Sequence, residues 1–414
     1  MARRLPPPDP GVRALLRMTG RNPMTRRQVL AGMGLAGSAA GLAACAPPLP
    51  PAGGGAPTLT LPVDKSATEK TVAWANWTAY LDQDEAATTY PTLEAFMKET
   101  GITATYAVDI EDNDAYVAKV KPQLQAVPPQ DINRDIFTLT DWMANRVIRD
   151  GLVQPLDLIH MPNVGRLRES LKDVSFDPGR KWSMTWQSGF AGIGYDKEKV
   201  GRELKSIADL WAPDLKGKVV TLSEMRDTVG LIMQTQGVDI SGSFTKDQVA
   251  TAMDEVSKRV ADGSIRRIKG NSYLEDLKSG NAIAGIVWSG DLFVLRAETE
   301  NDNWEFVIPD SGGTFWSDNM MIPLTSTHRR NAMKLIDYYY RPDVAAQVAA
   351  YVNYVCPVEG AQEEMKKIDA ELAESPFIFP SEQWIAEHKI QGFRALNAQE
   401  DADYSAMWAK VVGN

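Results

Sequence analysis

Two acidic side chains, Glu224 and Asp227, stand three residues apart in "TLSEMRDTVG". If a helix begins at Ser223 after the apolar run "KVVTL", both carboxylates lie on one face of its first turn. A third acid, Asp318, follows Trp316 by two residues in "GGTFWSDNMMIP". A carboxylate beside a large aromatic ring can bind an organic cation, because the carboxylate forms charge-assisted hydrogen bonds and the ring face attracts positive charge.

Aromatic side chains recur where other apolar runs end. Trp77 and Tyr80 lie in "NWTAYL", Trp288 ends the run "AIAGIVW", and Trp142 and Trp186 lie at expected strand-to-loop positions. In open α/β sheets, ligands bind at the carboxyl ends of the strands. We therefore expect several of these aromatic side chains and the three acids to surround one ligand.

Each of these groups also has a purely structural interpretation. Glu224 and Asp227 could stabilise a helix N-terminus through the helix dipole, Trp288 could belong to the core, and Asp318 could cap a turn. The recurrence of acids with tryptophans favours a binding site, and these residue types suit an organic diamine or polyamine. Its ammonium ends need carboxylates and its methylene chain needs flat apolar walls, whereas a metal ion would need oxygen ligands without the aromatic walls.

The order of the elements predicts an α/β protein. Strands are expected within 71–80, 102–108 and 134–140, and helices within 91–101 and 141–151, so that strand and helix alternate. This alternation is typical of an α/β fold with largely parallel sheets. Further elements are expected as strand pieces around a Gly-rich bend at 183–196, helices at 246–262 and 272–279, a helix pair interrupted at Pro342, and a helical stretch at 380–412.

The sequence does not indicate an enzyme. The histidines, His160, His328 and His388, are scattered and form no metal-binding motif. There is no P-loop and no GxSxG motif, and Gly189, Gly192 and Gly194 do not have the GxGxxG spacing. We expect no catalytic residues, no metal and no cofactor, and we expect the three glycines to form a tight bend.

Length and charge limit the function further. The 414 residues are enough for two or three domains, and the composition, 44% hydrophobic and 24% charged, is that of a globular protein. The formal net charge of -10 argues against a nucleic-acid partner, because nucleic acids bind basic surfaces.

The N-terminal segment predicts export. Residues 24–45 contain a twin arginine, Arg26 and Arg27, then a Gly/Ala-rich apolar stretch, then "LAAC" ending at Cys45. This order is typical of a twin-arginine signal peptide with a lipobox, although an uncleaved membrane anchor is the alternative. Cleavage before Cys45 would leave 37 basic and 53 acidic side chains, a net charge of -16, and Cys45 would carry the lipid. The remaining cysteine, Cys356, lies in an apolar setting and is expected to be buried.

The chain resembles the bacterial spermidine/putrescine-binding proteins, the extracytoplasmic receptors of polyamine ABC importers. The resemblance covers most of residues 70–360 and is carried by "NWTAYL", "SIADLWAPDLKGKV", "NSYLEDLKSGNAIAGIVWSGDLFVLRAE" and "GGTFWSDNMMIP". It implies a monomer with the type II-like periplasmic-binding-protein fold, whose ligand cleft lies between two discontinuous α/β domains that close by a hinge motion. The chain would then divide into a signal peptide (1–44), a Pro/Gly-rich tether (45–68), a first domain (69–188 with 318–360) and a second domain (189–317 with 361–414).

The resemblance also implies roles for single residues. Trp77 and Tyr80 match a wall of the ligand site, and Glu224 and Asp227 match an acid pair that binds one amine end. Asp318 matches an acid that binds another ammonium group. The matches that complete the site are Thr140 and Trp142 after the third strand, the stacking pair Trp288 and Trp316, and Tyr354.

The sequence departs from the family pattern at three positions. The order of the acids at 224 and 227 is reversed, Trp142 stands where the family has Tyr, and Gln391 is a weak match for a C-terminal Gln. These differences leave open which polyamine, or which other amine, is bound. Two further alternatives are a ferric-iron receptor that uses the consecutive tyrosines 338–340, and an anchored hydrolase. The expected partners of the protein are the polyamine ligand, a permease with its ATPase, and the membrane through the lipid.

Overall fold

The structure, a computed structural model, describes residues 61–84 and 86–413. The expected signal peptide, the lipidation site Cys45 and most of the expected tether lie outside these residues. Two segments, Leu61–Gln83 and Thr89–Asn414, form one compact unit. Within the separate short segment Asp84–Thr88, the Thr88 amide donates a 2.7 Å hydrogen bond to Asp84 Oδ1. The fold described below is that of the larger unit.

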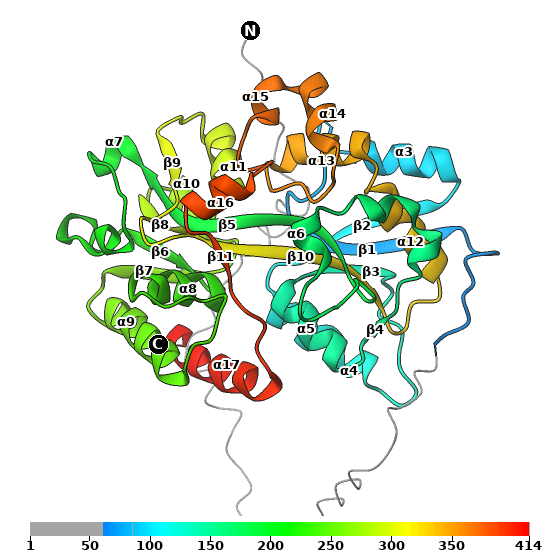
Figure 1. The fold of residues 1–414 in the computed structure, drawn as a ribbon, viewed down its shortest axis with the longest axis horizontal. Helices are drawn as coiled ribbons and strands as arrows, with labels where there is room; N and C mark the ends of the chain where they lie inside the picture. Colours follow the sequence, from blue (N-terminus) through cyan, green and yellow to red (C-terminus); the bar gives the residue numbers. More distant parts are fainter. Residues whose placement is uncertain (1–60, 85, 414) are drawn as a thin grey trace, which may run out of the picture. The chain divides into compact units, whose positions relative to one another are not determined.

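Eleven strands of the described residues form one sheet, in the order β2-β1-β3-β10-β5-β8-β6-β7, with β11 and β4 paired to β10 and β9 paired to β5 (Figure 1). The strands are β1 (Thr71–Trp77), β2 (Thr103–Ile110), β3 (Ile136–Thr140), β4 (Val153–Gln154), β5 (Met184–Asp196), β6 (Val219–Leu222), β7 (Ile265–Lys269), β8 (Ala284–Trp288), β9 (Trp304–Val307), β10 (Thr314–Pro323) and β11 (Gln391–Gly392).

Helices flank this sheet. The α-helices are α3 (Pro91–Thr100), α4 (Asn113–Leu124), α5 (Asp141–Arg149), α6 (Glu169–Lys172), α7 (Lys197–Val200), α8 (Met225–Thr235), α9 (Lys246–Ala261), α10 (Tyr273–Lys278), α11 (Ser289–Thr299), α12 (Arg329–Tyr338), α13 (Pro342–Val352), α14 (Ala361–Ile368), α15 (Ala370–Ala373), α16 (Glu382–Glu387) and α17 (Ala398–Val412). The 3-10 helices are η2 (Leu158–His160), η3 (Pro162–Arg166), η4 (Ile207–Trp211) and η5 (Pro213–Leu215).

The centre of the sheet differs from the prediction. The outer pairs are parallel, as expected, but the long strands β5 and β10 run antiparallel to each other and to their other main neighbours, β8 and β3. Figure 1 shows both strands extending across the two groups of shorter strands. The sheet is therefore mixed rather than largely parallel, because two of its strands return across the middle instead of following a helical crossover.

The expected Gly-rich bend at 183–196 is wrong. Residues 184–196 form the single continuous strand β5. A Cβ atom added to Gly189 would lie 2.5 Å from Cζ2 of Trp316, and one added to Gly194 would lie 2.5 Å from Cγ2 of Val287. These glycines therefore make room for side chains of neighbouring strands rather than turning the chain, a contact that spacing alone does not reveal.

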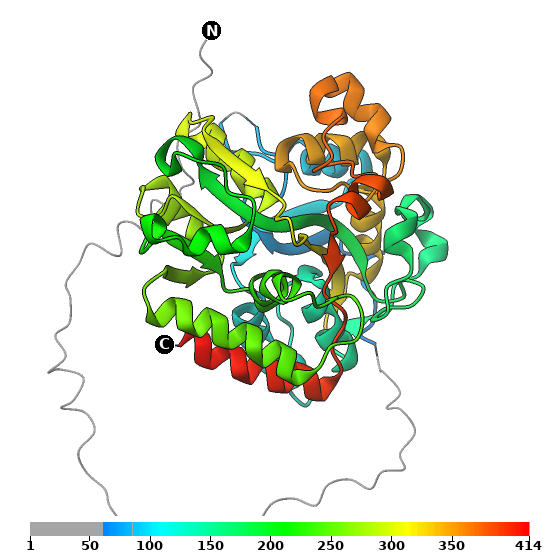
Figure 2. The same ribbon diagram turned by 60° about the vertical axis from the view of Figure 1, so that its left-hand side comes forward.

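Apolar side chains form three buried clusters. The first joins β1 to α3, α12, α13 and α14, and the third packs α4 and α5 against β1 and β3. The second packs α8, α9, α10 and α17 against β6 and β8, and Figure 2 shows α9 and α17 side by side. Residues 361–378 contribute to the first cluster and residues 396–411 to the second. The domain boundaries expected from the sequence stay a prediction.

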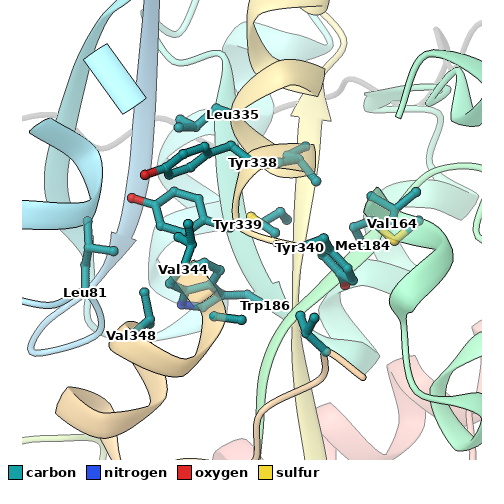
Figure 3. Packing of buried hydrophobic residues seen from close by; sticks show 14 of the residues in the cluster. Leu81, Val164, Met184, Trp186, Leu335, Tyr338, Tyr339, Tyr340, Val344 and Val348 are labelled. Carbon is teal, nitrogen blue, oxygen red and sulfur yellow. The ribbon is translucent and has the colours of Figure 1, made fainter. Parts of the chain in front are cut away.

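The three consecutive tyrosines belong to the first cluster. Figure 3 shows Tyr338 and Tyr339 at the end of α12 pointing to the same side, with Tyr339 beside Trp186 and Val344, while Tyr340 points away from them. All three are buried, and the ring of Tyr339 contacts that of Trp186 at 5.0 Å between centroids. The phenol of Tyr340 donates a 2.5 Å hydrogen bond to the Thr185 carbonyl, and that of Tyr339 lies 3.3 Å from the Thr92 hydroxyl, so both phenols are used in the packing of this cluster.

The C-terminal stretch and the tether also differ from expectation. Residues 380–412 are not one helical stretch, because β11 pairs with β10 between α16 and α17. Ordered contacts begin before Glu69: Ser66 is buried, and its hydroxyl oxygen accepts a 3.2 Å hydrogen bond from the amide of Asn331.

Cys356 is buried, as predicted. Among the described residues, no helix combines the length and apolarity needed to cross a membrane.

Candidate functional site

A pocket of roughly 860 Å³, part of it open to solvent, lies where the ends of several strands meet the starts of helices. Its wall contains nine of the ten predicted ligand-binding residues: Trp77, Tyr80, Thr140, Glu224, Asp227, Trp288, Trp316, Asp318 and Tyr354. The structure therefore brings these nine side chains together around one pocket. Their contact with a ligand stays a prediction.

Asp318 is a buried carboxylate held by two hydroxyl groups. Its Oδ2 accepts a 2.8 Å hydrogen bond from the Tyr80 phenol, and its Oδ1 accepts a 2.6 Å bond from the Thr140 hydroxyl. Burial raises the pKa of Asp318 to about 7, and the negative charge of Asp227 contributes in the same direction. The carboxylate thus lies in a place that favours a nearby positive charge.

Asp227 is the corresponding group on α8. Its Oδ1 accepts a 2.6 Å hydrogen bond from the Thr314 hydroxyl, and its Oδ2 accepts a 2.8 Å bond from the Trp288 indole. Burial raises its pKa to about 6. Trp288 ends β8 and packs against the first and second apolar clusters, so one ring both walls the pocket and orients the carboxylate.

One face of β10 organises these groups. Thr314, Trp316 and Asp318 are alternate residues of this strand, so their side chains point to the same side of the sheet. Trp316 therefore lies between Thr314, which binds Asp227, and Asp318. These two strand positions are about 14 Å apart, at four residues of about 3.4 Å each. Its ring contacts those of Tyr354 and Trp288 at centroid distances of 5.2 and 6.4 Å.

Glu224 has a different environment from the two aspartates. It is the N-cap of α8, where its Oε1 accepts a 3.2 Å hydrogen bond from the Arg226 amide, so the structural interpretation of this acid holds in part. Its Oε2 accepts a 2.8 Å bond from the Trp142 indole. Burial raises the pKa of Glu224 to about 7, although the Arg226 charge opposes the increase.

Trp142 and Gln391 do not line the pocket. Trp142, on α5, reaches it only through Glu224. Gln391 belongs to β11, and its side-chain carbonyl accepts a 3.0 Å hydrogen bond from the Ile240 amide. Gln391 is therefore used in packing the C-terminal segment, and the weak match at this position does not bring it to the site.

A fourth acid, Asp291, was missed from the sequence. It lies in the first turn of α11, lines the pocket, and accepts hydrogen bonds of 2.7 and 2.8 Å from the phenols of Tyr273 and Tyr354. Burial raises its pKa. Its position three residues after Trp288 was the available signal. The other unpredicted wall residues are Thr78, Ala79, Glu111, Asp112, Asn113, Ser223, Gly270, Asn271, Leu274, Val294 and Val352.

The arrangement of acids and aromatic rings suits a cationic ligand. Three of its carboxylates, Asp227, Asp291 and Asp318, accept hydrogen bonds from hydroxyl and indole groups, and within the described residues none of them has an ion-pair partner. Tryptophan and tyrosine rings supply flat walls between them. No group of three His, Cys, Asp or Glu side chains in the described part of the chain is arranged to hold a metal ion.

Comparison with known proteins identifies the family. Residues 92–376 match the family model of the bacterial extracellular solute-binding proteins. The chain belongs to this family. As a solute-binding protein it captures a small molecule outside the cytoplasm and is not an enzyme, so the predicted class of function and the predicted export are confirmed.

The names of similar relatives state the class of ligand that those proteins bind. The chain is 28% identical to the spermidine/putrescine-binding periplasmic protein of Escherichia coli (strain K12) over 318 residues, 76% of this chain and 84% of that protein. It is 26% identical to the Salmonella typhimurium protein of the same name over 339 residues, 81% and 91% of the two chains. A solved structure described as a spermidine/putrescine ABC transporter from Listeria monocytogenes has a TM-score of 0.70 at 25% identity, covering 83% of this chain and 99% of that one. The predicted resemblance and the predicted fold are thus confirmed.

Proposed function

We propose that this solute-binding protein captures a polyamine, spermidine or putrescine, and delivers it to the permease and ATPase of an ABC importer. One observation carries the proposal. Asp227, which Thr314 binds, and Asp318 are buried carboxylates at the β10 positions before and after Trp316, and neutral groups supply the hydrogen bonds that orient both. An ammonium group at each carboxylate would supply the positive charge that these buried acids lack.

The spacer between two ammonium groups fits the same geometry. A ligand running from Asp227 to Asp318 would pass over Trp316, with Trp288 and Tyr354 beside it. Apolar methylene groups against flat rings lose contact with water, and an ammonium group near a ring face gains about 0.5 to 2 kcal/mol. The names of the Escherichia coli and Salmonella relatives support the same ligand class.

The proposal includes the cell-surface arrangement expected from the sequence. After cleavage before Cys45, a lipid on that cysteine would anchor the protein, and the Pro/Gly-rich residues that precede Lys65 and Ser66 would link it to the body. The protein would act as a monomer in the periplasm or at the outer face of the cytoplasmic membrane. Its two discontinuous domains would close over the ligand.

Calorimetric titration tests the ligand class. The chain from Ala46 onward, purified without lipid and stripped of copurified ligand by unfolding and refolding, is titrated with putrescine, cadaverine, spermidine and spermine at pH 8. Tight one-to-one binding of at least one amine is expected. No heat with any of the four, in protein shown to be folded, would leave the solute-binding family intact but refute the polyamine assignment.

A further inference from the structure

The pocket contains an acid whose charge is already partly neutralised. Both carboxylate oxygens of Glu224 have partners: Oε2 accepts the hydrogen bond from the Trp142 indole, while Oε1 accepts the Arg226 amide and lies 3.7 Å from Nη1 of its guanidinium. Asp227, three residues later, has no such cation within ion-pair distance among the described residues. Neighbouring acids on α8 thus have different amounts of charge available to a ligand.

Arg226 cannot easily move away from Glu224. It is buried, with 8% of its surface exposed, and its Nη2 donates a 3.0 Å hydrogen bond to Oδ1 of Asp401 on α17. Asp401 also accepts bonds from Arg146 at 2.9 Å on each oxygen and from Arg149 at 3.1 Å. This acid on the C-terminal helix therefore fixes the position of the Arg226 side chain, and it lies beyond the stretch that matches the family model.

Trp142 is fixed by the same arginines. Its ring lies 4.0 Å from the Arg226 guanidinium carbon and 4.8 Å from that of Arg146. Stacking of a guanidinium on an indole restrains the ring. The indole N–H is consequently held toward Glu224.

From these contacts we propose that Arg226 and Trp142 are specificity-determining residues that act through Glu224. Arg226 offsets the negative charge of Glu224, and Trp142 occupies one of its oxygens, so the pocket favours amines with two positive charges over amines with three or four. The inference rests on the proposed function. With Arg226 present, the pair of acids on α8 and this arginine carry one net negative charge when ionised; without it they carry two, which favours a third ammonium group.

The test compares ratios of affinities. Putrescine, spermidine and spermine are titrated calorimetrically into the wild type and into Arg226→Gln, Arg226→Lys and Trp142→Phe at pH 8, with the melting temperature of each variant measured first. In Arg226→Gln we expect the affinities for spermidine and spermine, relative to putrescine, to rise about tenfold or more, the range of one charge-assisted hydrogen bond. Arg226→Lys keeps the charge but not the stacking on Trp142, so its ratio should shift by no more than about threefold, the shift expected for Trp142→Phe.

Two further variants separate this role from a structural one. Arg149→Gln removes an arginine that contacts Asp401 but not Glu224, and its ratio should equal that of the wild type. Trp142→Phe frees Oε2 of Glu224 without changing any charge, and should shift the ratio in the same direction by about threefold. If Arg226→Gln does not fold, Trp142→Phe decides the question.

Each result has one meaning. An equal loss of affinity for all three amines in Arg226→Gln, or an unchanged ratio in Trp142→Phe, would overturn this inference while leaving the proposed function standing. A wild type that binds none of the amines would overturn both.

Discussion

Replacing Asp318 with Asn removes one negative charge from the pocket while keeping the shape of the side chain. The two groups that bind it, the phenol of Tyr80 and the hydroxyl of Thr140, can each act as donor or acceptor. They can therefore still form hydrogen bonds with an amide. The variant tests the charge of Asp318 rather than its packing.

The size of the effect on apo stability follows from the pKa of this carboxyl. The pKa is about 7 in the folded protein against an ordinary value of 3.8 for an aspartate, and a difference of about three pKa units corresponds to about 4 kcal/mol. Because the folded state binds a proton that the unfolded chain has released, the contribution of Asp318 to stability falls as pH rises from about 4 to 7. In Asp318→Asn this contribution to the pH dependence disappears, and the melting temperature at pH 8 should be unchanged or higher.

Binding should change in the opposite direction. A hydrogen bond between an ammonium group and a carboxylate contributes about 1.5 to 3 kcal/mol, so the affinity for the amine should fall about 10- to 150-fold. Calorimetric titration at pH 8 measures the affinity, and differential scanning calorimetry of the apo protein from pH 5 to 8 measures the stability. A melting temperature several degrees lower, with unchanged affinity, would show that Asp318 is a structural cap and would refute this reasoning.

Asp177 offers a matched control. It is a buried aspartate outside the pocket, and its carboxylate accepts hydrogen bonds from the backbone amides of Lys181, Trp182 and Ser183. Asp177→Asn should lower the melting temperature, because an amide nitrogen cannot accept these bonds, while leaving amine affinity within about twofold.

The other predictions concern proton release on amine binding, the space beside the Trp316 ring, and the indole of Trp288. Amine binding near pH 6.5 should release protons from Asp318 and Glu224, whose pKa values of about 7 would fall beside a cation, and the heat of binding should therefore depend on the ionisation enthalpy of the buffer; equal heats in phosphate and Tris would contradict this. Gly189→Ala should displace the Trp316 ring, which would lie 2.5 Å from the new Cβ, and weaken binding at least tenfold by calorimetry; unchanged affinity would show that the ring position is unimportant. Trp288→Phe keeps an aromatic wall but removes a hydrogen bond to Asp227, and should weaken amine binding about five- to tenfold at pH 8. Trp288→Leu removes the ring as well and should weaken binding more. An equal effect of the two substitutions would show that the ring does not contribute.

Features controlled by neighbouring residues were predictable from the sequence. The helix expected at 246–262 is α9, Lys246–Ala261, because Thr245 and Gln248 form a capping box at its start. The break expected at Pro342 is the start of α13, since proline fits the first turn of a helix. The grouping of Trp316 and Asp318 was also local, because alternate residues of one strand share a face.

Features that depend on distant residues were not predictable. Residues 184–196 form one continuous strand, in which Gly189 and Gly194 make room for Trp316 and Val287, far along the chain. The acid at 291 faces the pocket because a tyrosine 63 residues later binds it. The hydrogen bond from Trp142 to Glu224 joins positions 82 residues apart. The spacing of Glu224 and Asp227 therefore could not show that one oxygen of Glu224 is already bound within the protein.

The central claim is that buried acids on α8 and β10 hold a cationic amine in this pocket. The most direct measurement is the calorimetric titration of putrescine, at pH 8, into the wild type and into the double variant Asp227→Asn/Asp318→Asn, both shown to be folded. We predict one-to-one binding by the wild type and no detectable heat of binding with the double variant at the same concentrations. Comparable binding by the double variant would contradict the account.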